Sequence, residues 1–349
     1  MKKQPSHPKP TMNINNVFNQ TLAQIEQAAE RPDGISGIPS GFNVLDKITS
    51  GFQKSELIII GSRPSMGKTA FLLSMIRNMA VDHKTPIALF SLESKNIKIA
   101  ERLMASECEL GSEKFRSGKL NKEEWEELNT KCQDLVNAPI FIDDTPYMTT
   151  SLLREKCIKL QKYNNVNCFC IDFIQLMKAD SEMKGNLEQE TNIISRELKR
   201  ITQELNVTFI VLSQLNRDIE RRTEYIKKPK LTDLRDSGAL EEDSDMVLFI
   251  HRPEKYGILS DSEGNDLRGV ADIIIAKHRN GAVGDIQLQF KNEFSKFCDL
   301  EEISPFSPID SGNVPQKFQS KMDSNNSKMQ IPFGQELPTA ADFDEDPPF

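Results

Sequence analysis

The sequence predicts an α/β domain in which a mostly parallel sheet is covered by helices on both faces. Short apolar runs, such as "ELIIIG" at 56–61 and "NCFCID" at 167–172, alternate with longer segments of helical periodicity. Strands that are almost entirely apolar are typical of a parallel sheet buried on both faces. A glycine-containing loop, "GSRPSMGKTA" at 61–70, leads from the first apolar run into a helical segment.

The N-terminal region divides into a polar tail and one amphipathic helix. Residues 1–12 are polar and rich in proline, so we expect them to be disordered. Residues 13–33 are predicted to hold a helix whose apolar stripe consists of Ile14, Val17, Phe18, Leu22 and Ile25. Because the breakers in "RPDGISGIPSG" separate this helix from the α/β region, the stripe can pack on its own domain or on another subunit.

The predicted strands and helices succeed one another along residues 34–300. Five apolar runs are assigned to parallel strands, at 56–61, 86–93, 139–144, 167–172 and 207–214. Helical patterns lie between or beside them, at 68–80, 96–109, 121–135, 149–163 and 187–205. Later runs lack clear helices between them and are expected to add antiparallel strands at one side of the sheet, at 245–251, 270–277, 286–290 and 296–300.

Composition restricts the compartment and the kinds of partner. No run reaches the roughly 18 apolar residues of a membrane span, and no apolar signal core follows the N-terminal lysines, so we expect a soluble, cytoplasmic protein without a membrane partner. Only Cys168 and Cys170 among the six cysteines are close in sequence, and reduced thiols are favoured over metal ligands.

The negative charge is concentrated in the tail. Residues 301–349 hold nine acids and three lysines, a net −6 out of −8, which leaves −2 for residues 1–300. Nucleic acid therefore stays open as a partner.

The loop at 62–69 has the features of a phosphate-binding loop. Gly67 allows close backbone approach, Lys68 reaches the β and γ phosphates of a nucleotide, and Thr69 ligates magnesium. Relative to the pattern GxxxxGK[ST], Ser62 replaces the first glycine, which is tolerable if its backbone angles are ordinary. A chance glycine turn is the alternative, which the flanking strand and helix disfavour. The loop supplies the predicted ATP-binding residues Ser62, Arg63, Pro64, Ser65, Met66, Gly67, Lys68, Thr69 and Ala70.

Three further strand ends carry polar side chains that an ATPase needs. Asp172 ends "CFCID", where a second carboxylate on the magnesium side is expected. Glu93 ends "ALFSLE" and is the candidate base that orients water, and Gln214 ends "FIVLSQ" and is the candidate sensor of the γ phosphate. The carboxyl ends of parallel strands meet at one edge of a sheet, so we expect these side chains to converge. ATP hydrolysis is therefore favoured over passive nucleotide binding.

Seven ordered blocks of the sequence resemble one protein family. They are "GIPSGFNVLDKITSGF", "SRPSMGKT", "SLES", "CIDFIQLM", "LSQLNR", "DLRDSGALEEDSDMVLF" and "AKHRNGAVG". Together they resemble the C-terminal motor domain of DnaB-type replicative helicases, which has a RecA-like core. The resemblance runs from about Gly34 to Leu300. It implies a homo-hexameric ring that encloses single-stranded DNA, translocates 5′ to 3′ and unwinds forked DNA with ATP and Mg²⁺.

The resemblance supports the roles given above and implies others. It makes residues 13–33 a linker helix that docks on a neighbouring subunit. Arg102, nine residues after Glu93, matches an arginine that contacts the nucleotide. Lys277 and Arg279 match a basic pair that a neighbouring subunit inserts at the γ phosphate. The block "DLRDSGALEEDSD" lines the central channel in the family, which implies DNA contacts at Arg235, Asp236 and Gly238.

Two segments outside these assignments have a strong charge pattern. The basic stretch "RDIERRTEYIKKPK" at 217–230 is either a loop near DNA or between subunits, or a solvated loop. The tail at 301–349 is predicted to be disordered and ends in "ADFDEDPPF". Its end is similar to the acidic tip of single-stranded DNA-binding proteins, which implies docking of Phe349 on a primase, polymerase or similar partner. A solubilising end, or one that competes with DNA, is the alternative.

One departure and one alternative function accompany the resemblance. Full-length DnaB-type helicases carry an N-terminal collar that helps to recruit primase, and only 33 residues precede Gly34. The resemblance thus covers the motor and linker helix, and gives no support for primase docking through a collar. The alternative function is a RecA-like ATPase that loads or remodels proteins on DNA without unwinding. A catalytically idle scaffold is disfavoured because the predicted catalytic residues are all present.

Overall fold

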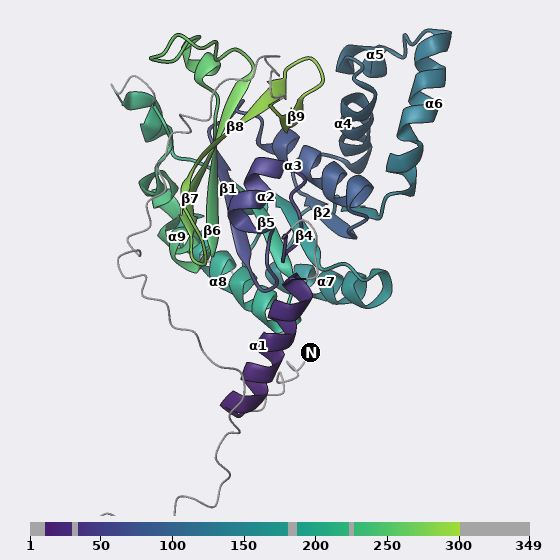
Figure 1. The fold of residues 1–349 in the computed structure, drawn as a ribbon. Helices are drawn as coiled ribbons and strands as arrows, with labels where there is room; N and C mark the ends of the chain where they lie inside the picture. The colour runs from purple at the N-terminus through teal and green to yellow at the C-terminus, as the bar shows by residue number, and fades with distance from the viewer. Residues whose placement is uncertain (1–10, 30–33, 181–186, 223–226, 301–349) are drawn as a thin grey trace, which may run out of the picture. The chain divides into compact units, whose positions relative to one another are not determined.

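A single nine-stranded sheet forms the centre of the protein, as seen in a computed structural model that describes residues 11–29, 34–180, 187–222 and 227–300 (Figure 1). Its strand order is β3-β2-β4-β5-β1-β6-β7-β8-β9, so β1 lies in the middle. The strands are β1 Leu57–Ser62, β2 Ile87–Ser91, β3 Ile140–Asp143, β4 Cys168–Asp172, β5 Thr208–Gln214, β6 Met246–His251, β7 Val270–His278, β8 Gly284–Lys291 and β9 Lys296–Asp299.

Strands β1 to β6 are parallel, and β7, β8 and β9 extend the sheet with antiparallel pairs. This confirms the predicted mixed sheet with one correction. The run at 245–251 was expected to be antiparallel, but β6 pairs with β1 in parallel. The crossover from β5 to β6 contains a 3₁₀ segment, Leu231–Ser237, and a short helix, α9 Gly238–Asp243. The acidic sequence of this crossover shows no helical apolar stripe, so its regular structure is not evident from periodicity.

The predicted helices are present, with small shifts at their ends. They are α1 Ile14–Ala29, α3 Lys68–Arg77, α4 Asn96–Cys108, α6 Lys122–Asn137, α7 Thr150–Asn164 and α8 Leu187–Leu205. A π-helical turn, Asn78–Asp82, prolongs α3. Two short helices, α2 Asn43–Thr49 and α5 Ser112–Ser117, were not predicted because neither is long enough to show a clear period.

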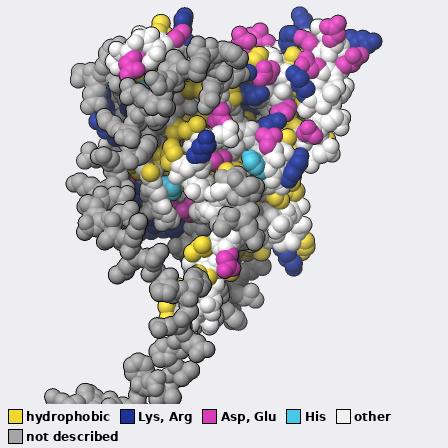
Figure 2. Space-filling view, viewed as in Figure 1, with side chains coloured by type: hydrophobic (Ala, Val, Ile, Leu, Met, Phe, Trp, Pro, Cys, Tyr) yellow, Lys and Arg dark blue, Asp and Glu magenta, His cyan; other side chains and the backbone are white. Residues whose placement is uncertain are grey.

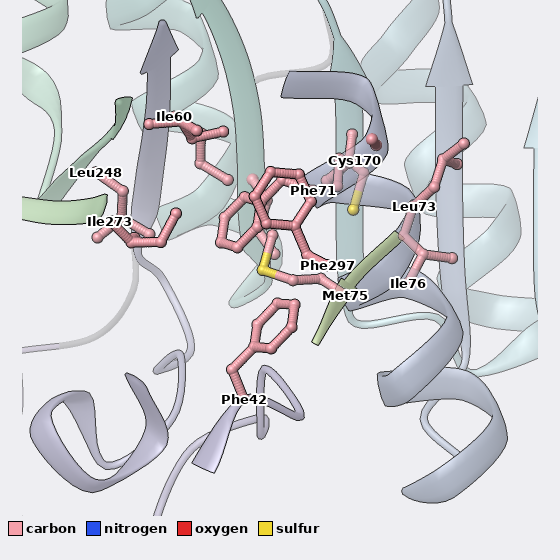
Figure 3. Close-up of a cluster of buried hydrophobic side chains, with 14 of the residues drawn as sticks. Phe42, Ile60, Phe71, Leu73, Met75, Ile76, Cys170, Leu248, Ile273 and Phe297 are labelled. Atoms are coloured by element: carbon pink, nitrogen blue, oxygen red, sulfur yellow. The ribbon is translucent and has the colours of Figure 1, made fainter. Parts of the chain in front are cut away.

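Two apolar cores cover the two faces of the sheet. Alternate residues of β1 enter different cores: Ile58 and Ile60 face one, and Leu57 and Ile59 face the other. On the first face, Phe71 of α3 stacks on Phe42 with ring centroids 5.3 Å apart and meets other apolar side chains around it (Figure 3). Helices α7 and α8 cover the second face. Burial on both faces explains why the central strands are apolar throughout.

Helices α4, α5 and α6 lie together to the side of β2 in Figure 1. Basic and acidic side chains are interspersed over this region in Figure 2, and several form ion pairs, including Lys114 with Glu124 and Lys131 with Glu127. Their small core contains Cys108 and Cys132. All six cysteines are free thiols, as expected.

Helix α1 carries the predicted apolar stripe on its surface. Ile14, Phe18 and Ile25 are each more than half exposed in the described chain. The predictions for residues 1–10, 30–33 and 301–349, including the tail and Phe349, concern residues outside the described ranges. Within those ranges, no helix is long and apolar enough to cross a membrane.

Candidate nucleotide-binding site

The phosphate loop, residues 62–69, joins β1 to α3 as the sequence predicts. Gly67 precedes the first residue of α3 and has a φ of 95°, a region that favours glycine. A Cβ atom at Gly67 would lie 3.1 Å from the Phe297 ring, so a side chain is also disfavoured by space. The amino end of α3 thereby opens toward the loop, where its free backbone amides and dipole favour a phosphate group.

The serine in place of the first glycine fits the loop. Ser62 is buried at the end of β1, and it is not among the described residues with positive φ. Its hydroxyl donates a 2.9 Å hydrogen bond to the carbonyl of Arg63. A serine is thus compatible with this backbone, because the position does not need the left-handed conformation that glycine permits.

Sheet register brings the candidate catalytic residues to one edge. Ser62 at the end of β1 pairs with Gln214 at the end of β5, and Ser91 at the end of β2 pairs with Asp172 at the end of β4. Glu93 follows β2 by two residues. These strand ends lie on the same side as the amino end of α3, which matches the predicted convergence.

Thr69 and Asp172 form the part of the site that suits a magnesium ion. The Thr69 hydroxyl donates a 2.9 Å hydrogen bond to Oδ2 of Asp172. The second oxygen, Oδ1, is buried without a protein partner. Burial raises the pKa of Asp172, and the hydrogen bond from Thr69 opposes this.

A hydroxyl and a carboxylate are a sufficient protein contribution for this ion. Among the described residues no three His, Cys, Asp or Glu side chains gather into a metal cage. Magnesium commonly keeps several waters and binds through one or two protein oxygens together with substrate phosphates. The donors at Thr69 and Asp172, including the unpaired buried oxygen, therefore fit it.

Two cations face the carboxylates. Burial lowers the pKa of Lys68 to about 8, while Asp172 and Glu93 pull it upward. Its Nζ donates a 3.3 Å hydrogen bond to the carbonyl of Ser213 and lies 5.3 Å from the centre of the Phe173 ring. Burial also lowers the pKa of Arg102, against the attraction of the same two carboxylates. Both cations would gain from an anionic ligand, because neither is fully compensated for its lost hydration.

Arg102 also lines a small pocket beside α3. The other walls include Ala70 and Leu73 of α3, Ser106 of α4, and the turn between β8 and β9 at Phe294 and Ser295. The pocket places apolar and small polar side chains next to the phosphate loop, an arrangement that suits the less charged part of a nucleotide.

Glu93 and Gln214 are exposed at the open side of the site. A side chain that sequence reasoning missed, Gln175, organises the backbone beneath Gln214. Its amide nitrogen donates to the hydroxyl of Ser213 at 3.0 Å and to the carbonyl of Gln214 at 3.4 Å. Gln175 lies within the block "CIDFIQLM", but no role was predicted for it, because that role depends on a contact with β5.

Lys277 and Arg279 are not at this site. They lie near the end of β7, where Met246 pairs with His278, and Met246 also pairs with Ile58 near the start of β1. The two basic residues are therefore at the opposite edge of the sheet from Lys68. Lys277 donates to the carbonyls of Glu241 and Ser244, and Arg279 contacts the carbonyl of Glu242 and the carboxylate of Asp245. They thus cap the carboxyl end of α9.

The predicted DNA-contact positions lie just before and at the start of α9. Arg235 and Asp236 belong to the 3₁₀ segment that precedes it, and their side chains are outside the description. Gly238 is exposed and helical, with a φ of −50°, and a Cβ atom there would meet nothing within 4 Å. The backbone conformation alone does not require glycine at this position.

Comparison with known proteins gives a consistent result. Residues 37–299 match the family model described as the DnaB-like helicase C terminal domain. The chain is 42% identical over 289 residues to the replicative DNA helicase DnaB of Geobacillus stearothermophilus, and 41% identical over 289 residues to the replicative DNA helicase DnaC of Bacillus subtilis. Each match covers 83% of this chain and 62% of the relative, so the chain spans about three fifths of their length.

Solved structures agree with the sequence relatives. One of them, an ATPase domain, superposes with a TM-score of 0.76 at 32% identity, covering 84% of this chain and 100% of that one. A DnaB-like replicative helicase, determined in a study of its interactions with primase, gives a TM-score of 0.73 at 32% identity, covering 84% of this chain and 68% of that one. The predicted RecA-like core is therefore confirmed.

Proposed function

The chain belongs to the DnaB-like helicase C-terminal domain family, and from this premise we propose that it is the ATP-driven motor of a replicative DNA helicase. In this proposal a homo-hexameric ring encloses single-stranded DNA in the cytoplasm, moves 5′ to 3′ and separates the strands of forked DNA. The observation that carries it is the placement of Lys68 and Arg279 at opposite edges of the sheet. If Arg279 acts at the γ phosphate, it must therefore act on the site of a neighbouring subunit.

The residues of one chain support the binding half of ATP hydrolysis. Lys68 and the first amides of α3 hold the β and γ phosphates, and Thr69 and Asp172 hold magnesium, which neutralises phosphate charge when bound. Glu93 accepts a proton from the water that attacks the γ phosphorus, while the bond to the β–γ bridging oxygen breaks. Gln214 contacts the γ phosphate and relays its presence.

The neighbouring subunit supplies the other half. Its copies of Lys277 and Arg279 stabilise the negative charge that develops on the transferred phosphoryl group, the role of an arginine finger. Hydrolysis then depends on assembly. Arg235, Asp236 and Gly238 are proposed to hold DNA by its phosphates, and Gly238 is exposed, with open space around its Cα atom.

Unwinding by the purified chain tests the proposal against the alternative of a loading ATPase that does not unwind. We expect DNA-stimulated ATP turnover and displacement of a strand from a fork with a 5′ tail, both lost in Lys68→Ala. Glu93→Gln is expected to retain binding of an ATP analogue but not unwinding. ATP turnover without displacement on any forked substrate would favour the loader.

We propose a separate partner site at the C-terminal tail. The terminal Phe349 follows four acids and two prolines in "ADFDEDPPF", a pattern suited to an apolar pocket with a basic rim on a primase or polymerase. Deletion of the last nine residues is expected to spare ATP turnover and to abolish capture of such a partner from host extract, with Phe349→Ala causing most of the loss. Equal capture by the parent and Phe349→Ala would exclude this role.

A further inference from the structure

Arg63 lies in the phosphate loop, but its side chain is bonded elsewhere. Its side chain is only 6% exposed. Nη1 donates a 2.8 Å hydrogen bond to the carbonyl of Leu215, and Nε donates a 3.0 Å hydrogen bond to Oε1 of Glu220. Both acceptors belong to the segment that comes after Gln214. The Arg63 guanidinium, although it belongs to the phosphate loop, is therefore hydrogen-bonded to the segment after Gln214.

The acceptors are fixed by their own surroundings. Leu215 and Ile219 are buried in the core that α8 also covers, which holds the start of this segment against the sheet. Glu220 lies in a 3₁₀ turn, Arg217–Arg221, and its side chain is 55% exposed. The Arg63 guanidinium holds the pKa of Glu220 below its ordinary value. Arg63 therefore connects the phosphate loop to a buried residue, Leu215, and to an exposed residue, Glu220.

The same turn begins the basic stretch at 217–230. On its far side, Lys227 donates a 3.0 Å hydrogen bond to the carbonyl of Glu220, and its Nζ lies 5.7 Å from the centre of the Tyr256 ring. Arg222 donates to the carbonyl of Lys228 at 3.3 Å. These hydrogen bonds join the described residues before and after 223–226 into one structural base for the basic stretch. Glu220 is part of this base.

The planar guanidinium of Arg63, which bonds two acceptors, can transmit a movement of the phosphate loop to the segment after Gln214. An arginine fork holds its acceptors in fixed directions, and loss of a partner leaves a buried charge uncompensated. A shift of the Arg63 side chain on nucleotide binding would therefore move the exposed Glu220, while the buried Leu215 keeps the start of the segment on the sheet. The base of the basic stretch exposes Arg217 and Arg221, side chains that favour phosphates.

We infer that Arg63 is a positioning residue that couples occupancy of the phosphate loop to the base of the basic segment, residues 217–222 and 227–230, and through it to the affinity for single-stranded DNA. The inference rests on the proposed function, because it takes ATP and DNA as the two ligands. It assigns the basic segment to DNA rather than to bulk solvent. Glu220 is the exposed partner, and Glu220→Gln removes its charge while the Arg63 hydrogen bond to the Leu215 carbonyl remains.

The test compares DNA affinity with and without nucleotide in the full chain. Binding of a fluorescent oligothymidylate is measured with and without ATPγS and Mg²⁺, for the parent and for Glu220→Gln. We expect ATPγS to strengthen DNA binding of the parent by about fivefold or more. In Glu220→Gln the ratio of the DNA affinities with and without ATPγS should fall toward one. The affinity for ATPγS and the ATP turnover without DNA should stay at the parent level.

Asp218→Asn is the matched control. It makes the same change of charge in the same turn, but Asp218 pairs with the exposed Arg221 and not with Arg63. It should keep the parent ratio. Arg63→Gln should lose the ratio as Glu220→Gln does, and the double variant should lose no more than either, because the two residues act as one unit.

The outcomes separate this inference from the proposed function. An unchanged ratio in Glu220→Gln, with the parent ratio well above one, overturns the inference and leaves the motor intact. An equal loss in Asp218→Asn also overturns it, because charge in the turn would then explain the effect. If the parent binds neither ATPγS nor oligothymidylate, the proposed function itself fails.

Discussion

At the scale of single residues, Lys68 is a buried cation whose charge a bound phosphate would stabilise. Burial lowers its pKa to about 8 in the free protein. A bound triphosphate favours the protonated form, so the pKa in the complex is higher than in the free protein. Between these two pKa values binding must take up a proton, and the affinity for ATP must fall as pH rises.

The expected result is a pH dependence of nucleotide affinity with a defined direction. The dissociation constant of a fluorescent ATP analogue should be nearly constant below about pH 8 and should then rise by up to about tenfold per pH unit. Terminal phosphates with a second pKa of about 6 are already fully ionised there. Lys68→Arg is the control, since a guanidinium stays protonated, and its affinity should be flat. A flat profile in the parent between about pH 7 and 10 would show that Lys68 does not titrate in this range.

At the scale of elements, the parallel strands were predictable because burial on both faces makes them apolar throughout. The phosphate loop was predictable because its chemistry depends on neighbouring residues in the sequence. Register then brought Asp172 and Gln214 to the same edge, as expected. The short α2 and α9 and the parallel pairing of β6 were not predictable, because no periodicity marks them.

Contacts between segments that are distant in the sequence could not be predicted either. Arg63 was expected among the ATP-binding residues, but its guanidinium contacts a distant segment, with a separation of 157 positions from Glu220. Gln175 supports Gln214 from the 3₁₀ turn Ile174–Leu176 that follows β4, 39 positions away. Neither contact has a local pattern. Such positioning residues become evident only when the fold brings their partners together.

At the scale of the whole molecule, the sheet separates two groups that the proposed reaction needs. The end of β1 carries the phosphate loop, while Lys277 and Arg279 lie level with the start of β1. In each chain the basic pair caps α9, the helix whose start holds the proposed DNA contact at Gly238. An assembly that places this edge of one subunit on the phosphate loop of the next would complete the site and put a DNA contact beside every interface.

Mixing two inactive variants tests this shared site most directly. Arg279→Ala should lose about 10³-fold or more in turnover, the contribution of an arginine finger, and Lys68→Ala should lose turnover because it cannot hold the phosphates. In a mixed ring, some interfaces pair an intact phosphate loop with an intact Arg279. ATP turnover should therefore rise well above that of either variant as the two are mixed, with a maximum at intermediate ratios. Turnover that stays at the level of the separate variants at every ratio, in rings shown to contain both, would contradict a site shared between subunits.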